Sequence, residues 1–151
     1  MLRRIVHQMG SHGPRWPEVV LYSIVMIVYA CADLIFATKI RATAEALGIV
    51  SRPARDSEKL QARLDRVDDG KPNGAVKAVL IDLDLGQDAL PLIRLSVNHP
   101  AQPVVVAFGA HVAVDLLRAA AEAGADPVMA RGAFTGQLPD LLQRWDQPSP
   151  A

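Results

Sequence analysis

Two predominantly apolar runs constrain the fold of this chain more than any other feature. Residues 75–83 read AVKAVLIDL and residues 103–108 read PVVVAF. Strands that are covered by helices on both faces show such near-continuous apolar runs, because neither face meets water. A stretch with helical spacing of apolar residues follows each run. The pattern therefore predicts parallel strands joined by right-handed helical crossovers.

The same alternation of strand and helix extends in both directions and predicts an α/β fold. Five strands would form a doubly wound parallel sheet, with helices on both faces in three α/β/α layers. Residues 68–74 (DDGKPNG) have the composition of a loop. We expect strands at residues 24–30, 49–52, 75–83, 103–108 and 127–130, and helices at residues 34–47, 57–67, 88–97, 112–123 and 135–145.

Capping residues define three of the expected helix starts. Asp33, Ser57 and Thr135 each precede or open a periodic apolar stretch. Their side chains can accept a hydrogen bond from the free backbone N–H groups of a first helical turn. Pro139 would then fall in the first turn of the last helix, where proline is tolerated.

The composition fits one globular domain. The chain has 151 residues, half of them apolar, and its 16 basic residues equal its 16 acidic ones. Nucleic-acid binding normally requires a basic excess, so we expect no nucleic-acid partner. The single cysteine, Cys31, excludes an internal disulfide and fits a reducing, cytoplasmic location. We expect residues 1–23 to be a flexible or mis-assigned extension, residues 24–145 to be the domain, and residues 146–151 to be a disordered tail.

Residues 19–32 (VVLYSIVMIVYACA) allow a second interpretation. With arginines upstream and an A-x-A-like end, the stretch is similar to a signal peptide, and its extension to Ala37 approaches the length of a membrane span interrupted by Asp33. The richness in Val, Ile and Tyr favours a buried strand instead. Glycine and prolines also separate the arginines from the run. We therefore expect a strand and no membrane association.

Ligands of open parallel sheets gather at the carboxyl ends of the strands. The residues that follow each expected strand are therefore the candidates for a functional site. They are Cys31, Ala32 and Asp33 after the first strand, Asp82 and Asp84 after the third, Phe108 and Gly109 after the fourth, and Arg131 and Gly132 after the fifth.

Four stretches, in this order, resemble the receiver domain of bacterial two-component response regulators. They are IDLDLGQDAL, PVVVAFG, LLRAAAEAGAD and VMARGAF, and the resemblance covers about residues 24–145. It implies a flavodoxin-like fold, a role in signal transduction by phosphorelay, and an aspartate phosphoacceptor at the position of Asp82. It also implies a basic counterion for the phosphoryl group at the position of Arg131.

The metal-binding part of the receiver pattern is missing. Receivers hold magnesium with an acidic pair after the first strand together with the acceptor aspartate, and that pair corresponds to Cys31 and Ala32. Only Asp33 lies next to these vestigial positions. Magnesium requires near-octahedral oxygen ligands, which cysteine and alanine side chains cannot supply. We expect no cofactor, with magnesium doubtful and Asp33 and Asp82 as weak metal candidates.

The switch part of the pattern is also altered. The Thr or Ser that receivers place after the fourth strand corresponds to Phe108 or Gly109, and their switch aromatic corresponds to Val128. The lysine that receivers place after the fifth strand corresponds to Arg131, and arginine is not a neutral replacement for a lysine point charge. The proline that follows it corresponds to Gly132. These departures predict a degenerate receiver without normal magnesium-dependent aspartyl phosphorylation.

Other interpretations stay open. VLIDLDLGQD is also similar to the first motif of haloacid-dehalogenase phosphatases, with Asp82 as nucleophile and Asp84 as general acid, and a receiver still phosphorylated on Asp82 is a further alternative. Asp82 can instead be solvated or paired with Arg131, with Asp84 a simple loop residue. Asp33 can be a helix cap, and Cys31 a small buried side chain or a redox-sensing thiol.

We expect a stand-alone domain that is not an enzyme and acts by protein contact. The partner would be another signalling protein, a kinase or an output partner, or a second copy bound through the fourth and fifth helices, as the resemblance implies. No P-loop or G-x-G-x-x-G pattern follows any expected strand, so the sequence shows no cradle for a nucleotide phosphate.

Overall fold

The computed structural model describes residues 25–68 and 71–146. The expected extension at residues 1–23 and nearly all of the expected tail lie outside the described residues. Thirteen elements follow one another along the described chain: β1 (Val25–Ala30), α2 (Leu34–Ala46), β2 (Val50–Pro53), α3 (Ser57–Leu64), β3 (Val67–Asp68), β4 (Lys71–Pro72), β5 (Ala75–Asp82), the 3-10 helix η1 (Leu83–Asp88), α4 (Ala89–Asn98), β6 (Val104–Gly109), α5 (Val114–Glu122), β7 (Val128–Ala130) and α6 (Arg131–Trp145).

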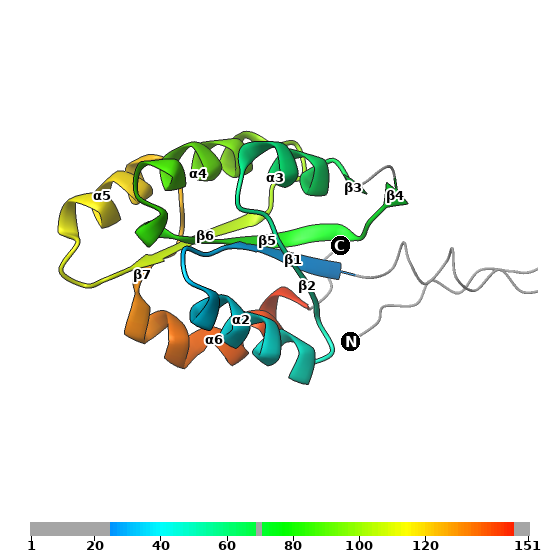
Figure 1. Cartoon of the computed structure of the whole chain (residues 1–151), viewed down its shortest axis with the longest axis horizontal. Helices are drawn as coiled ribbons and strands as arrows, with labels where there is room; N and C mark the ends of the chain where they lie inside the picture. Colours follow the sequence, from blue (N-terminus) through cyan, green and yellow to red (C-terminus); the bar gives the residue numbers. More distant parts are fainter. Residues whose placement is uncertain (1–24, 69–70, 147–151) are drawn as a thin grey trace, which may run out of the picture.

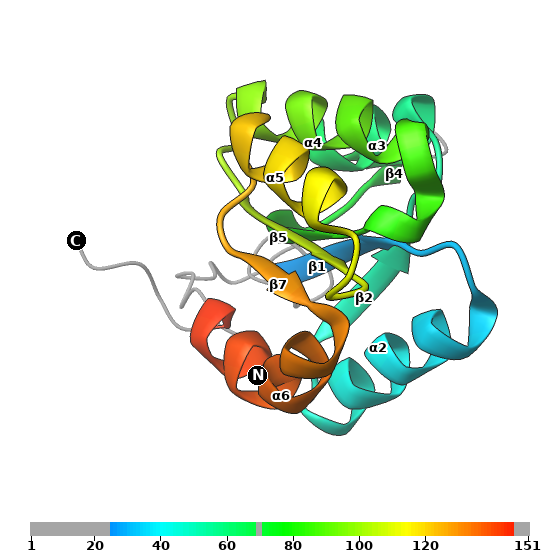
Figure 2. The ribbon, with the colours of Figure 1, turned by 90° about the vertical axis from the view of Figure 1, so that its left-hand side faces the viewer.

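Five of the described strands form one parallel sheet in the order β2-β1-β5-β6-β7. Helices α3, α4 and α5 cover one face, and α2 and α6 cover the other (Figures 1 and 2). The predicted doubly wound sheet in three layers is therefore confirmed. The chain reverses direction across the sheet after β2, since β5 pairs with β1 on the side opposite β2.

The alternating side chains of the central strands divide the core into two halves. On the α3–α5 face, Val28, Val79 and Ile81 pack with Leu60 of α3 and Ile93 of α4. On the α2–α6 face, Ile27, Leu80 and Phe108 pack with Ile40 of α2 and Phe134 of α6. Both faces of β5 are thus buried from Ala78 onward, which explains its apolar residues 78–81.

The strand register places the carboxyl ends of four strands at one level. Ala30 pairs with Ile81, so the residues after β1 lie beside Asp82. Asp82 pairs with Phe108 of β6, and Gly109 pairs with Ala130 of β7. The residues after β1, β5, β6 and β7 therefore converge on one edge of the sheet.

The first apolar run is a strand where the structure describes it. Val28 and Ala30 of β1 are buried at 1 % exposure or less. Among the described helices none is long and apolar enough to cross a bilayer. Residues 19–24 of the same run lie outside the described residues.

Two of the three expected caps are wrong. Asp33 does cap α2, with its Oδ1 accepting a hydrogen bond from the Phe36 N–H at 2.7 Å. The cap of α3 is Asp56 rather than Ser57, because its carboxylate accepts from the Lys59 N–H at 2.7 Å. Residues 68–74 are not entirely loop, since β3 and β4 form a short antiparallel pair there.

The start of the last helix is the larger correction. Helix α6 begins at Arg131, directly after β7, and Thr135 lies inside it. The extended backbone of Ala130 serves as the helix cap without a side-chain hydrogen bond. Pro139 is consequently in the helix interior and not in the first turn, where it removes one backbone donor. This early start brings Arg131 to the carboxyl edge of the sheet.

Candidate functional site

Asp82 is the centre of the candidate site and is buried, with 1 % of its surface exposed. Its Oδ2 accepts a hydrogen bond from the backbone N–H of Ala32 at 3.1 Å. Its Oδ1 accepts one from the backbone N–H of Asp84 at 2.9 Å and one from Nη2 of Arg131 at 2.9 Å. Burying a carboxylate costs free energy unless it is paired and hydrogen-bonded, and these three donors meet that requirement.

Arg131 bridges two carboxylates. The same Nη2 that contacts Asp82 lies 2.9 Å from Oδ2 of Asp84, which is half exposed. Partial burial works to lower the pKa of Arg131, but the hydrogen bond to Asp84 and the charge of Asp82 outweigh it and raise this pKa above its ordinary value. The guanidinium also lies over the ring of Phe36, 5.7 Å from its centroid. It is therefore a fixed cation.

The expected pairing of Arg131 with Asp82 is confirmed, and Asp84, which we expected to be a loop residue, lies in η1 and joins the same ion pair. The backbone N–H of Asp84 bonds to Asp82 and its carboxylate bonds to Arg131. The sequence offers one signal for this arrangement, because Asp82 and Asp84 are two residues apart. A side chain that accepts from the N–H two residues later is a common turn of Asp and Asn.

The three positions after β1 have separate environments. Cys31 is buried on the α2–α6 face. Its burial, reinforced by the charges of Asp82 and Asp33, raises the pKa of the thiol to about 12, so the redox-sensing thiolate is not supported. Ala32 contributes its backbone N–H to Asp82. Asp33 is committed to the cap of α2, which confirms the interpretation as a helix cap.

Magnesium does not fit this arrangement. The oxygens of Asp82 already accept three hydrogen bonds, and the side chains of Cys31 and Ala32 add no oxygen ligand. Within residues 25–68 and 71–146, no group of three or more His, Cys, Asp and Glu side chains could hold a metal ion. A hard divalent cation prefers several carboxylate or carbonyl oxygens, and the guanidinium of Arg131 would repel it.

The switch positions are packed against neighbouring side chains. Phe108 stacks on Phe134 of α6 with centroids 4.1 Å apart and on Phe36 of α2 with centroids 5.0 Å apart. Gly109 lies so close to η1 that a Cβ at this position would be 3.0 Å from the Cβ of Leu83. A Thr or Ser side chain at Gly109 would therefore require Leu83 to move. Val128 is half-buried and packs against the core of the α3–α5 face.

No protein-family model and no curated protein matches the sequence. Solved structures do match, and they decide the fold. A response regulator from Thermotoga maritima superposes with a TM-score of 0.63 at 18% identity, over 82% of this chain and 98% of that one. This chain has the receiver fold. The receiver domain of NtrX from Brucella abortus matches with a TM-score of 0.63 at 17% identity, over 82% and 99% of the two chains. A CheY-like receiver domain protein from Methanospirillum hungatei matches with a TM-score of 0.61 at 13% identity, over 82% and 98%.

The receiver fold explains why the four strand ends form one site. In this fold the carboxyl edge at β1, β5, β6 and β7 is where the sequence resemblance locates the phosphorylation residues. The chain retains an aspartate there, Asp82, and a basic residue, Arg131. The structure joins these two directly and leaves the remaining positions as a buried thiol, a backbone donor and a glycine.

Proposed function

We propose that this chain is a receiver-like signalling domain that works by protein contact, without magnesium-dependent phosphorylation of Asp82 and without enzymatic turnover. The hydrogen bonding of Asp82 is the observation that supports the proposal. Its carboxylate is buried and already accepts bonds from Ala32, Asp84 and Arg131. Phosphoryl transfer requires a carboxylate oxygen in line with the donor and local neutralisation of charge.

Charge neutralisation is the weak point of any phosphorylated form. A phosphoryl group brings nearly two negative charges. Among the described residues the cation that contacts Asp82 is Arg131, and it is already shared with Asp84. In the receiver pattern a bound metal ion neutralises this charge, and the residues present here do not fit a metal ion. The phosphatase alternative meets the same obstacle, since Asp82 and Asp84 are held by a single guanidinium and neither is free to act as nucleophile or acid.

The proposal includes a protein partner in the cytoplasm, either another signalling protein or a second copy of the chain. The surface at α5 supports this part. Ala120 is the one fully buried residue of that helix. Val112 and Val114 at its N-terminal end are 74 % and 54 % exposed. Light scattering of the native chain and of a Val112→Asp/Val114→Asp variant tests self-association, and loss of a dimer in the variant would identify α5 as its interface.

Intact mass spectrometry after incubation with phosphoramidate and magnesium tests the central claim. We expect no phosphoryl group on the native chain. A variant with Cys31→Asp, Ala32→Asp and Arg131→Lys, which restores the acidic pair and the lysine of the receiver pattern, is expected to gain one, and adding Asp82→Asn to that variant should abolish it. A phosphoryl group on the native chain that is lost in Asp82→Asn alone contradicts the proposal. Repeated release of phosphate from p-nitrophenyl phosphate would instead support the phosphatase.

A further inference from the structure

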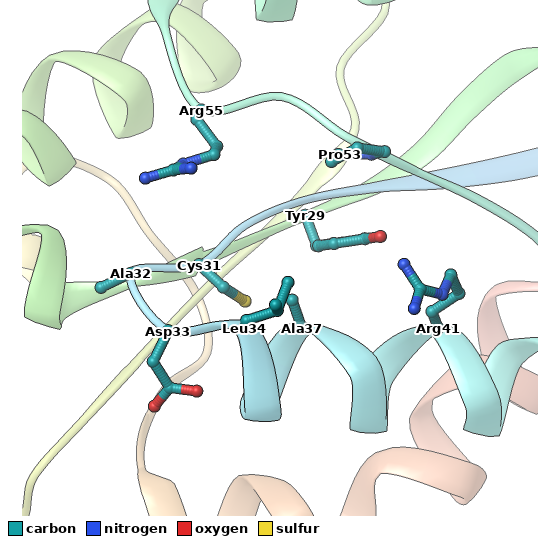
Figure 3. Close-up of a pocket in the computed structure, with 9 residues that line it drawn as sticks. All are labelled: Tyr29, Cys31, Ala32, Asp33, Leu34, Ala37, Arg41, Pro53 and Arg55. Carbon is teal, nitrogen blue, oxygen red and sulfur yellow. The ribbon is translucent and has the colours of Figure 1, made fainter.

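A pocket of about 370 Å³ opens beside the Asp82 site, between α2 and the ends of β1 and β2 (Figure 3). Leu34 and Ala37 of α2 and Pro53 of β2 form its apolar part. Two arginines also line it, Arg41 from the second turn of α2 and Arg55 from the connection after β2. The remaining lining residues are Tyr29, Cys31, Ala32 and Asp33. In Figure 3 the two guanidinium groups lie at opposite ends of the labelled lining.

Tyr29 supplies a polar group inside the pocket. The residue is 97 % buried, with 3 % of its surface exposed, yet it lines the cavity. Its ring points toward the guanidinium of Arg41 in Figure 3. Within the described residues the hydroxyl has no hydrogen-bond partner and is not one of the fully buried polar atoms, so it faces the open pocket. A hydroxyl in this position is a donor that a ligand can use.

The two arginines are also without carboxylate partners in the described part of the chain. The nearby acidic groups are otherwise engaged. Asp33 bonds to the Phe36 N–H, and its carboxylate is turned away from the other labelled side chains in Figure 3. Asp56, next to Arg55, caps α3. The pocket therefore presents two guanidinium groups and one hydroxyl donor against a single carboxylate, that of Asp33 at its rim.

We propose that this pocket binds a small organic molecule with an anionic group, phosphate or carboxylate, at each end of a largely apolar body. One anionic group is held by Arg41 and the hydroxyl of Tyr29, and the other by Arg55. The planar guanidinium fork suits both groups, because it donates two parallel hydrogen bonds to a carboxylate or a phosphate. The apolar body lies on Leu34, Ala37 and Pro53.

This site is separate from the buried carboxylate site. Asp82 is closed by its own donors, whereas the pocket is open to solvent and lies on the α2 side of β1. The two meet at Ala32, which lines the pocket and donates its N–H to Asp82. Binding is therefore tested without a phosphodonor, and its outcome does not depend on whether Asp82 is phosphorylated.

The test is a titration of the full chain, followed by amide resonances in ¹H–¹⁵N NMR spectra. Glutarate and 1,5-pentanediol bisphosphate are the two-ended probes, and methyl phosphate is the single-ended comparison. We expect saturable shifts centred on the pocket residues, with weaker binding of methyl phosphate. Whichever two-ended probe binds more tightly assigns the anion as carboxylate or phosphate. Arg41→Gln and Arg55→Gln should each weaken binding about tenfold, the scale of one lost charge-assisted hydrogen bond.

Two controls make the result decisive. Tyr29→Phe keeps the buried ring and removes only the hydroxyl, so it should weaken binding while leaving the spectrum dispersed. Arg118→Gln removes an exposed arginine of α5, far from the pocket, and should leave binding unchanged. Absence of saturable shifts with both two-ended probes overturns the proposal. So does equal weakening by Arg118→Gln, which would show attraction to surface charge alone.

Discussion

Removing the guanidinium of Arg131 tests how much the contact with Asp82 contributes to stability. The substitution is Arg131→Met, because methionine keeps an unbranched side chain like the aliphatic part of arginine and removes the charge. It leaves Asp82 buried with its two backbone donors but with no cation against it. Asp84 loses the same partner but remains half exposed, so water can solvate it.

The structure sets the magnitude. Breaking a fully buried ion pair by removing one partner costs about 3–5 kcal/mol, whereas an exposed pair contributes about 0–1 kcal/mol. Asp82 is at the buried limit, with its side chain 2% exposed, but Arg131 is 30% exposed and partly screened by water. We therefore expect Arg131→Met to lower the free energy of unfolding by about 2–3 kcal/mol, between these limits.

Double-mutant cycles separate the two carboxylates that share the guanidinium. Combining Arg131→Met with Asp82→Asn should give a coupling of about 1.5–2.5 kcal/mol, because this pair is shielded. Combining it with Asp84→Asn should give below about 1 kcal/mol, the range of exposed pairs. Asparagine keeps the volume of each side chain, so the cycle reports mainly on charge.

Urea unfolding at pH 7 measures these changes. For an m-value of about 2 kcal/mol/M, a loss of about 2–3 kcal/mol moves the midpoint down by roughly 1–1.5 M. Far-UV circular dichroism follows the helices and strands independently of Trp145, which lies in the core. Equal coupling of Arg131 to both aspartates, or an Arg131→Met variant as stable as the native chain, would refute the reasoning, because either result means that water screens Asp82.

Three further predictions follow from single contacts. Gly124→Ala should lower stability by about 2 kcal/mol or more, measured by urea unfolding, because φ is +109° and the new Cβ would lie 2.9 Å from Val97 Cγ1. The stability of the native chain relative to Cys31→Ala should be constant below pH 9 and fall between pH 9 and 12, because burial raises the thiol pKa from 9.0 to about 12; a constant difference up to pH 12 would contradict this. The hydrogen bond from His99 lowers the pKa of Asp65, so carboxyl NMR titration should give a higher value in His99→Gln.

The fold was predictable from the sequence because its strands are buried on both faces. Val79, Leu80 and Ile81 are all fully buried, two facing α3–α5 and one facing α2–α6. Between Lys77 and Asp82 this strand has no polar residue, so the run is visible in the sequence. Helix starts were less predictable, because Ala130 begins α6 through backbone geometry and no side chain marks the position.

The site was predictable in its members but only partly in its bonds. A parallel sheet brings the residues at its strand ends together, so a contact between Asp82 and Arg131 was predictable. Two of the three donors to Asp82 are backbone N–H groups, from Ala32 and Asp84. The direction of these N–H groups depends on local φ and ψ angles, which cannot be read from the amino-acid sequence. The stack of Phe36, Phe108 and Phe134 likewise joins three elements and has no local signature.

The departures from the receiver pattern become consistent with one another once the bonds are known. Without an acidic pair after β1, a buried Asp82 needs other positive partners, and the N–H of Ala32 together with Arg131 supplies them. Without a hydroxyl residue after β6, Gly109 lets Leu83 approach closely. Each replacement closes the site around the carboxylate of Asp82. Under the proposed function an input to this domain acts elsewhere on its surface, and the arginine-lined pocket that shares Ala32 with the closed site has room for it.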